Sequence, residues 1–489
     1  MINSINIIVK DNFVKCLIIV YFLLHIPHFI LPLSGGHRWR QTTTASVSRN
    51  YVNESLYFFH PRIDVRGDKT GIAGMEFPFY NYLVSIIYQL LGSTWVGFGK
   101  SLSFVFAILS LLLLSKIVGY HENNSYVDRT SLNIFFVIIS GLLSPYLFRF
   151  SSRFMPETLA LFFSLLGFYY YYLYINDKSL RYYIVCWFCL TLGTLIRPYF
   201  IFFGLPILSR FLFFKGDPIR IRLLIGLLGF LILIPFYIWY YQYVPYLNNR
   251  YGIVYFNLGV YNYRDNLLLY LNPFMWMGLL NTIMKYYTEY VLFPFAIIGI
   301  YKYFRASYSS VNKKLEFFLK PVSQLLFVGI LTLLLLPSII GEYYILHYYY
   351  LAAIFPIFTI GIGYSLQLIN IRYPIGYRVI LSVISVIIFV SFFHTFRLDK
   401  DLILLKRILP EIEQNSKESD LFVVDDAGSS TYLFFINRKG WSVDFTSIKS
   451  ESLLLEELIK YRDKGAKFAV IKDLDPGENL CGFRMLRLE

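Results

Sequence analysis

Apolar segments long enough to cross a bilayer recur along most of this sequence, and they constrain its fold more than any other feature. A helix needs about 20 apolar residues to span the hydrocarbon core. We place eleven such windows, near residues 13–33, 97–117, 132–148, 157–175, 182–198, 199–213, 223–243, 288–304, 321–341, 348–368 and 377–396. Only 16% of the residues are charged, whereas soluble domains carry about 25%. The predicted fold class is an α-helical polytopic membrane protein with eleven transmembrane helices.

The distribution of basic residues predicts the orientation of these helices. The formal net charge is +14, but most basic residues lie in short loops, so this charge does not require nucleic acid as a partner. If the first helix is a retained signal anchor with a cytoplasmic N-terminus, the inner loops hold Lys116, Arg129, Lys178, Arg181, Lys215, Arg220, Arg222, Lys302, Arg305, Lys313, Lys314, Lys320, Arg372 and Arg378. The short outer connections hold far fewer, chiefly Arg149, Arg153 and Arg197. The positive-inside rule favours this orientation.

Three outer segments are too long or too polar to be plain connections. They are residues 34–96, 244–287 and 397–489. The last contains "LFVVDD" and "KFAVIKD", which have the composition of buried strands, and the helical pattern "ESLLLEELIKYRDKG" between them. We therefore expect a transmembrane domain over residues 1–396 and a small extracytoplasmic α/β domain over residues 397–489.

The first outer segment combines two expected helices with a polar turn. "TTTASVSRNYVNE" and "FPFYNYLVSIIYQLLG" are predicted to be amphipathic helices that lie along the membrane surface. The turn between them gathers acids beside bases: Asp64, Asp68 and Glu76 with Arg62, Arg66 and Lys69. Such a mixture between two surface helices indicates a site rather than a spacer.

Several stretches, in order along the chain, resemble motifs of one enzyme family. They are "HRWRQTTTASVSRNY", "HPRIDVRG", "GMEFPFYNYLVSIIYQLLG", "SSRFMPETLALFF", "TLIRPYF", "HYYYLAAIFP" and "INRKGW". This set resembles the bacterial membrane glycosyltransferases of family 39 type. They belong to the GT-C superfamily, with the protein O-mannosyltransferases and the aminoarabinose transferases of lipid A. The resemblance spans nearly the whole chain and implies a GT-C fold in the bacterial cytoplasmic membrane.

The resemblance also implies a reaction. A sugar would pass from a polyprenyl-phosphate carrier to a lipid, polysaccharide or protein acceptor on the outer face. The carrier phosphate is then the leaving group, and cations must neutralise it. The acceptor hydroxyl needs a carboxylate base or a carboxylate-held divalent metal ion, and the residues leave both possibilities open.

Three carboxylates are candidates for the catalytic role. Glu76 opens the second expected surface helix, Asp64 lies in "RIDVRG", and Glu157 lies at the start of a predicted span. A structural reading stands beside each: a favourable charge at a helix N-terminus for the glutamates, and a salt bridge for Asp64. Many relatives carry Asp where this chain has Thr43. Either Asp64 or Glu76 is therefore the base, with Glu157 supporting it, or the protein is a divergent or inactive relative.

The cationic and aromatic residues of these motifs are candidates for binding the phosphate or substrate. They are His37, Arg38, Arg40, Gln41, Arg153, Arg197, His347, Tyr348, Arg438 and Lys439. We expect the last two to close over the cavity from the C-terminal domain, although an exposed turn would explain them equally well. The alternative for the arginines is attraction to anionic headgroups of membrane lipids, worth about 1 kcal/mol each.

Two other functions would suit a chain of this kind. A transporter or flippase of lipid-linked glycans would also have many helices and a basic cavity. However, the sequence has no paired interrupted helices and no internal repeat. A noncatalytic GT-C relative remains open because of Thr43. The identities of the sugar and of the acceptor are not encoded in any motif that we recognise.

The topology yields the first prediction. Cysteines placed at Ser55, Asn249 and Ser416, in a background without the four native cysteines, should react with an impermeant maleimide in intact spheroplasts. All three positions belong to segments expected on the outer face. Protection of the cysteine at position 416 alone would show that one span was miscounted.

Overall fold

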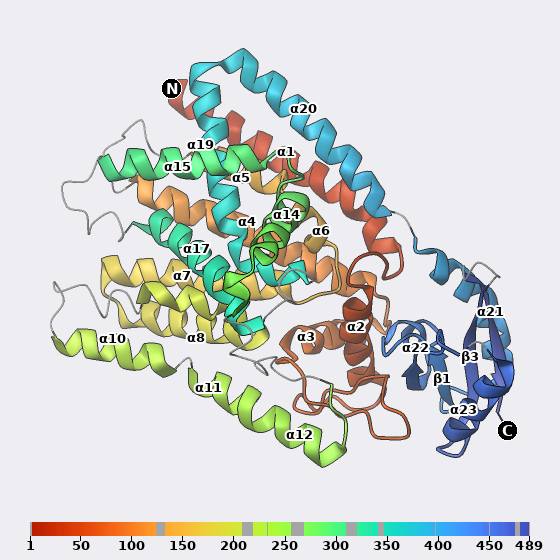
Figure 1. Cartoon of the computed structure of the whole chain (residues 1–489). Helices are drawn as coiled ribbons and strands as arrows, with labels where there is room; N and C mark the ends of the chain where they lie inside the picture. The colour runs from red at the N-terminus through yellow and green to blue at the C-terminus, as the bar shows by residue number, and fades with distance from the viewer. Residues whose placement is uncertain are drawn as a thin grey trace.

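The computed structural model describes most of the chain as a helical bundle with a small α/β domain at one end, beside α2 (Figure 1). The described residues are 2–123, 133–207, 219–231, 233–255, 268–309, 320–340, 347–396, 398–448, 450–474 and 480–488. The sequence predicted this division into a helical part and a C-terminal α/β part.

Each predicted apolar window contains helix in the structure. The helices are α1 (Ile2–Ile30), α4 (Gly97–Asn123), α5 (Ile134–Leu142), α6 (Pro145–Ser151), α7 (Glu157–Asp177), α8 (Leu180–Ile196), η1 (Pro198–Gly204), α10 (Ile219–Leu231), α11 (Leu233–Tyr237), the π-helical η2 (Ile238–Tyr243), α15 (Phe293–Ser309), α17 (Pro321–Ile340), η4 (Tyr348–Ile354), α19 (Phe355–Arg372) and α20 (Pro374–Phe393). Part of the window at 199–213 lies outside the described residues.

The expected number of eleven spans is not confirmed. Within the described ranges, four segments are long and apolar enough to cross a membrane: Asn12–Ile30, Gly97–Gly119, Glu157–Asp177 and Tyr348–Arg372. The pair α5 and α6, bent by 63°, makes a fifth if it is one span. Leu180–Ile196, Pro198–Ile207, Pro321–Pro337 and Pro374–Val390 are apolar but only 10–17 residues long. The apolar helices make the chain a membrane protein.

Helix α2 (Arg38–Asn53) is covered by protein and does not lie along the membrane surface. This corrects the expectation from the sequence. Every residue from Arg40 to Ser48 is buried. The helix packs against α3 (Phe79–Leu91) and against α22 (Thr431–Phe435) of the C-terminal domain. Its polar side chains are therefore covered by protein, and much of their hydrogen bonding is internal.

The second outer segment is also partly helical. It forms α12 (Val244–Tyr251), the 3-10 turn η3 (Leu269–Leu271) and α14 (Pro273–Tyr287). Residues 256–267 of this segment lie outside the described part. The side chain of Asn248 in α12 accepts a hydrogen bond from the backbone N–H of Gly74 at 2.9 Å. The segment thereby contacts the first outer loop and supports it.

The C-terminal domain is a four-stranded sheet with helices packed against it. Its elements are η5 (His394–Phe396), α21 (Lys400–Asn415), β1 (Leu421–Asp425), α22, β2 (Lys439–Val443), α23 (Glu451–Arg462), β3 (Ala466–Leu474) and β4 (Leu480–Arg487). The strand order is β2-β1-β3-β4, with β1 parallel to β2 and β3, and β4 antiparallel to β3. The sequence predicted β1, β3 and α23, but not β2 and β4.

Alternating residues of the strands serve two separate cores. Phe422 of β1 and Phe468 of β3 join one apolar cluster, whereas their neighbours Val423 and Ala469 join another. Successive side chains of a strand point to opposite faces, so both faces of the sheet are covered. The short apolar runs of β1 and β3 are recognisable because these strands are buried on both sides.

Backbone pairing joins this domain to the first outer loop. Gly440 in β2 forms an isolated parallel bridge with Val65. Its carbonyl oxygen accepts hydrogen bonds from the N–H groups of Arg66 at 2.9 Å and Gly67 at 2.8 Å, and its own N–H donates to the carbonyl oxygen of Asp64 at 3.1 Å. The motifs "RKGW" and "RIDVRG" are therefore two sides of one interface.

The position of Gly440 admits no side chain. Its φ is 147°, and an added Cβ would overlap the backbone of Phe422. Because Phe422 lies in β1 of the same domain, we predict that Gly440→Ala forces β2 away from β1 and so disturbs the strand that pairs with the loop. Increased limited proteolysis after residue 396 would detect this change. Gly428→Ala is the matched control, because Gly428 also has a positive φ (80°) but lies in open space. The control should show only the backbone cost of about 1–3 kcal/mol. Equal proteolysis of both variants would contradict this account.

Candidate active site

Two arginines and two glutamates form a buried network where the outer loop meets the helical bundle. Arg40 comes from α2, Glu76 from the loop before α3, Glu157 from the start of α7, and Arg197 from the end of α8. Arg197 donates to Oε1 of Glu76 at 2.8 Å and also pairs with Glu157. Arg40 pairs with the same Oε1 of Glu76. Four segments that are distant in the sequence are joined by these contacts.

Prolines fix the backbone at three corners of the network. Pro156 and Pro78 occupy the N-cap positions of α7 and α3. Arg197 is the C-cap of α8, with φ −143° and ψ 110°, directly before Pro198. The residue before a proline is pushed into extended conformation. The helix therefore ends at this arginine.

Burial and mutual neutralisation define the electrostatics of the network. The exposed fractions are 1% for Glu157 and Arg197, 5% for Arg40 and 7% for Glu76. Buried charges are tolerated when they are paired, and two cations face two anions here. Burial alone would raise the pKa of Glu76, but the charges of Arg40 and Arg197 outweigh it and hold this pKa below its ordinary value. Glu76 is therefore a carboxylate at neutral pH.

The network retains unused hydrogen-bonding capacity. Among the described residues, Oε2 of Glu76, Oε2 of Glu157, and Nε of both Arg40 and Arg197 have no hydrogen-bond partner. Buried polar atoms without partners are costly and uncommon. The site can therefore accept a polar ligand that donates to the carboxylates and accepts from the guanidiniums.

Aromatic rings enclose the network on the side of η4. Tyr349 lies under the guanidinium of Arg197, with its ring centroid 5.5 Å away. His347 lies 5.7 Å from both His37 and Trp39 between ring centroids. Burial, and then the charge of Arg153, lower the pKa of His37 to about 3, so this imidazole is neutral. His37, His347 and Tyr348, all expected at the site, thus lie together beside it.

The structure separates Asp64 from the two glutamates. Its carboxylate is fully buried and accepts hydrogen bonds from Arg49 at 2.5 Å and Asn50 at 2.9 Å. Arg49 follows Arg40 by nine residues in α2, a rise of roughly 13 Å. Arg49 also donates to the carbonyl oxygen of Phe434. Asp64 is thus part of the support for the C-terminal domain.

Arg38 likewise connects the two parts of the chain. Its guanidinium donates to Asp399 at 2.8 Å and to Asp401 at 2.6 and 2.8 Å. Burial would raise the pKa of Asp401, but the hydrogen bond and charge of Arg38 lower it below its ordinary value. Arg38 therefore holds α2 to the start of α21. Its guanidinium N–H groups, which were expected to bind phosphate, are bonded to these two carboxylates.

A polar cavity of about 240 Å³ includes in its lining Gln41, the residue after Arg40. Arg153 lines this cavity and donates to the carbonyl oxygen of Gly36 at 2.6 Å. Lys100 lines it as well, and the sequence analysis missed this residue. A lysine inside an apolar span is the signal that could have found it. Its ammonium group donates to the carbonyl oxygens of His28, Leu31 and Pro32, which places it at the end of α1.

Arg438 and Lys439 lie away from the network. Arg438 is buried inside the C-terminal domain and bonds to Ser416. Lys439 forms an ion pair with Glu54. Arg438 thus stabilises the domain internally, whereas Lys439 contributes to its contact with the first outer loop. The structure thus gives no support to the expectation that they close over a phosphate.

Thr43, at the position where the sequence resemblance implied an acid, contacts the C-terminal domain. Its hydroxyl donates to the carbonyl oxygen of Trp39 at 2.9 Å and lies 2.7 Å from the hydroxyl of Ser430. Thr42 lies 3.0 Å from the same hydroxyl. At this position, therefore, two uncharged hydroxyl groups form a hydrogen bond that joins α2 to the C-terminal domain.

The side chains present do not fit a divalent metal ion. Within the described ranges, no group of three or more His, Cys, Asp or Glu side chains converges. Glu76 and Glu157 do share one site, but each is bonded to a guanidinium. A further cation there would lie beside two positive charges. We therefore derive no step through a metal.

Comparison with solved structures identifies the fold. ArnT from Cupriavidus metallidurans in the apo state gives a TM-score of 0.59 at 12% identity, covering 95% of this chain and 93% of ArnT. The archaeal oligosaccharyltransferase AglB from Archaeoglobus fulgidus, in complex with an inhibitory peptide and a dolichol-phosphate, gives 0.55 at 12% identity, covering 95% and 70%. No family model matches the sequence, and no curated protein matches it. The chain thus shares the fold of ArnT and of AglB.

The charge network yields a prediction about stability. Arg197→Met leaves buried negative charge without compensation and should cost about 3–5 kcal/mol. Adding Glu157→Gln restores neutrality and should recover part of this loss. Unfolding of the purified variants in detergent micelles measures both effects. If the double variant loses as much as the two single variants added together, the four side chains do not act as a network.

Proposed function

We propose that this protein is a membrane glycosyltransferase that moves a sugar from a polyprenyl-phosphate carrier to an acceptor on the outer face. The observation that carries the proposal is the buried network of Arg40, Glu76, Glu157 and Arg197 in a chain with the GT-C fold. AglB, which has this fold, was solved with a dolichol-phosphate. A phosphate-linked lipid is therefore a chemically reasonable donor here.

The arginines are suited to the leaving group. As the glycosidic bond breaks, negative charge develops on the carrier phosphate, and preorganised cations stabilise it most in a site without water. Arg40 and Arg197 are both buried and fixed by carboxylates before any ligand arrives. Each retains an Nε–H without a partner within the described residues. These donors are available to phosphate oxygens.

The glutamates are suited to activating the acceptor. Glu76 is bonded to two guanidiniums, whereas Glu157 is bonded to Arg197 alone. A carboxylate near more positive charge holds a proton less well. We therefore assign the base to Glu157 and the placement of the two arginines to Glu76. In this account Asp64 supports the loop and does not touch substrate.

These groups account for the proton and the leaving group of the transfer step. The acceptor hydroxyl gives its proton to Oε2 of Glu157 while its oxygen bonds to the anomeric carbon. The bond from that carbon to the phosphate oxygen breaks, and its electron pair leaves with the polyprenyl phosphate. Arg40 and Arg197 hold the phosphate during this step. The proton acquired by the carboxylate compensates the charge that the phosphate brings into the site.

An apolar pocket near Arg197 provides room for the carrier lipid. Its volume is about 270 Å³, and its lining comes from α8, η1, α10 and α11. Thr194, three residues before Arg197, lies in this lining. Alkyl chains bury favourably in such surroundings. The pocket supports a donor with a phosphate at the arginines and a prenyl chain among the apolar helices.

One observation favours the noncatalytic alternative. Thr43 offers no carboxylate and is bonded to Ser430. The proposed enzyme must therefore use Glu157 and Glu76 instead of an acid in α2.

Amide substitutions test the assignment. Glu157→Gln keeps the size of the side chain but removes the base, and should slow transfer by about 10²–10⁴-fold. Mass spectrometry of lipid-linked glycans, from cells with and without the protein, identifies the donor. Accumulation of that donor then reports the activity of each variant. Glu76→Gln should also lose activity, because it removes the charge partner of Arg40 and one of the two charge partners of Arg197.

Asp64→Asn is the matched control for these substitutions. It makes the same chemical change in the same outer region but outside the charge network. It should weaken domain docking more than transfer. If Asp64→Asn abolishes transfer in a stable protein while Glu157→Gln does not, the base is misassigned. If lipid-linked glycans are identical with and without the wild-type protein, the noncatalytic alternative is favoured.

A further inference from the structure

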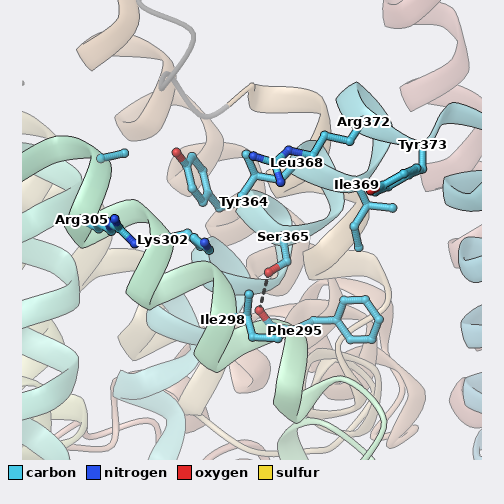
Figure 2. A pocket seen from close by; sticks show the side chains of 11 residues that line it. Phe295, Ile298, Lys302, Arg305, Tyr364, Ser365, Leu368, Ile369, Arg372 and Tyr373 are labelled. Carbon is cyan, nitrogen blue, oxygen red and sulfur yellow. Dashed lines mark hydrogen bonds between the residues drawn. The ribbon is translucent and has the colours of Figure 1, made fainter.

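A further pocket lies between α15 and α19, and the proposed transfer reaction does not use it. Its volume is about 580 Å³, within the usual range for ligand sites. Its lining consists of Phe295, Ile298, Lys302, Arg305, Ala306, Tyr364, Ser365, Leu368, Ile369, Arg372 and Tyr373. Figure 2 shows Lys302 and Arg305 projecting from α15, and Arg372 and Tyr373 at the end of α19.

The charge of this pocket is entirely positive. Lys302, Arg305 and Arg372 are the charged side chains of its lining, and no acid accompanies them. None of the three has a hydrogen bond or ion pair within the described residues. Three uncompensated cations around one hollow repel one another. An anion placed between them would relieve this repulsion.

The rest of the lining carries no charge and is mostly apolar. Ile298, Leu368 and Ile369 contribute alkyl surface, and Phe295 contributes a ring. The wall is held by a hydrogen bond of 2.6 Å from the hydroxyl of Ser365 to the carbonyl oxygen of Phe295, drawn in Figure 2. A ligand that satisfies both parts of the pocket must carry an anionic group and hydrocarbon.

The pocket lies far from the candidate active site. Tyr348 in η4 contacts His37 beside the charge network, and Arg372 is the last residue of α19, which follows η4. The 18 residues of α19 rise by about 27 Å, close to the thickness of the hydrocarbon core. The cations thus lie at the membrane surface opposite the site.

We propose that this pocket binds an anionic phospholipid of the leaflet opposite the active site. The headgroup phosphate would lie between Lys302, Arg305 and Arg372, and the acyl chains would follow Ile298, Leu368 and Ile369. Basic pockets between membrane helices recognise anionic headgroups in this way. The alkyl wall distinguishes a lipid from free phosphate. This inference does not depend on glycosyl transfer.

Native mass spectrometry of the purified full-length protein tests the proposal. The probes are dioleoyl phosphatidylglycerol and dioleoyl phosphatidylcholine, which differ in headgroup charge. We expect the anionic lipid to bind at least about tenfold more tightly, and Arg372→Gln or Lys302→Gln to weaken it about fivefold each. Ile298→Trp, which fills the pocket without changing its charge, should also reduce binding. The melting temperature in detergent verifies that each variant is folded.

Arg378→Gln is the matched control. Arg378 is exposed near the start of α20 and does not line the pocket, and the substitution removes the same charge. It should leave lipid binding unchanged. An equal loss in Arg378→Gln would show general attraction to the membrane surface and overturn the proposal. Displacement of the lipid by excess inorganic phosphate, or full binding in Ile298→Trp, would overturn it as well.

Discussion

The rest of the candidate site depends on one buried set of charges. Arg40, Glu76, Glu157 and Arg197 are withdrawn from water, and each would be costly there alone. The cost is offset only when all four meet with their opposite charges in contact. Because they come from α2, the following loop, α7 and α8, their pairing fixes the first outer loop against the bundle. The same ion pairs therefore set both the geometry of the site and the packing of the first outer loop against the bundle.

The C-terminal domain completes this arrangement from the other side. A helix as polar as α2 could not be buried without partners for its side chains. The domain supplies Ser430 to Thr43 and two aspartates to Arg38, and it adds backbone pairing at Gly440. It thereby acts as a fixed wall of the site. Lys439, one of the two residues expected to close over a ligand, contributes to this attachment through Glu54.

The charge balance of the network also bears on how the site compensates the charge of a ligand. The two cations and two anions of the network sum to no net charge. A phosphate adds negative charge, and the balance returns when a carboxylate takes a proton from an acceptor. Binding of the phosphate and activation of the acceptor are thus linked by electrostatics in our proposal. The lipid pocket at the other membrane surface is independent of this linkage.

The sequence by itself indicated the helical segments and the small α/β domain, because apolar length and strand composition are local properties. It offered Glu76, Glu157, Arg40 and Arg197 only as candidates, through the order of its motifs. It did not determine the burial of α2, the strands β2 and β4, or which acid meets which arginine. Asp64 and Glu76 lie in one loop and look alike in sequence, yet only the fold places one beside Arg49 and the other beside Arg197. Ion pairing in a low-dielectric interior depends on distances between remote segments, and tertiary structure alone sets those distances.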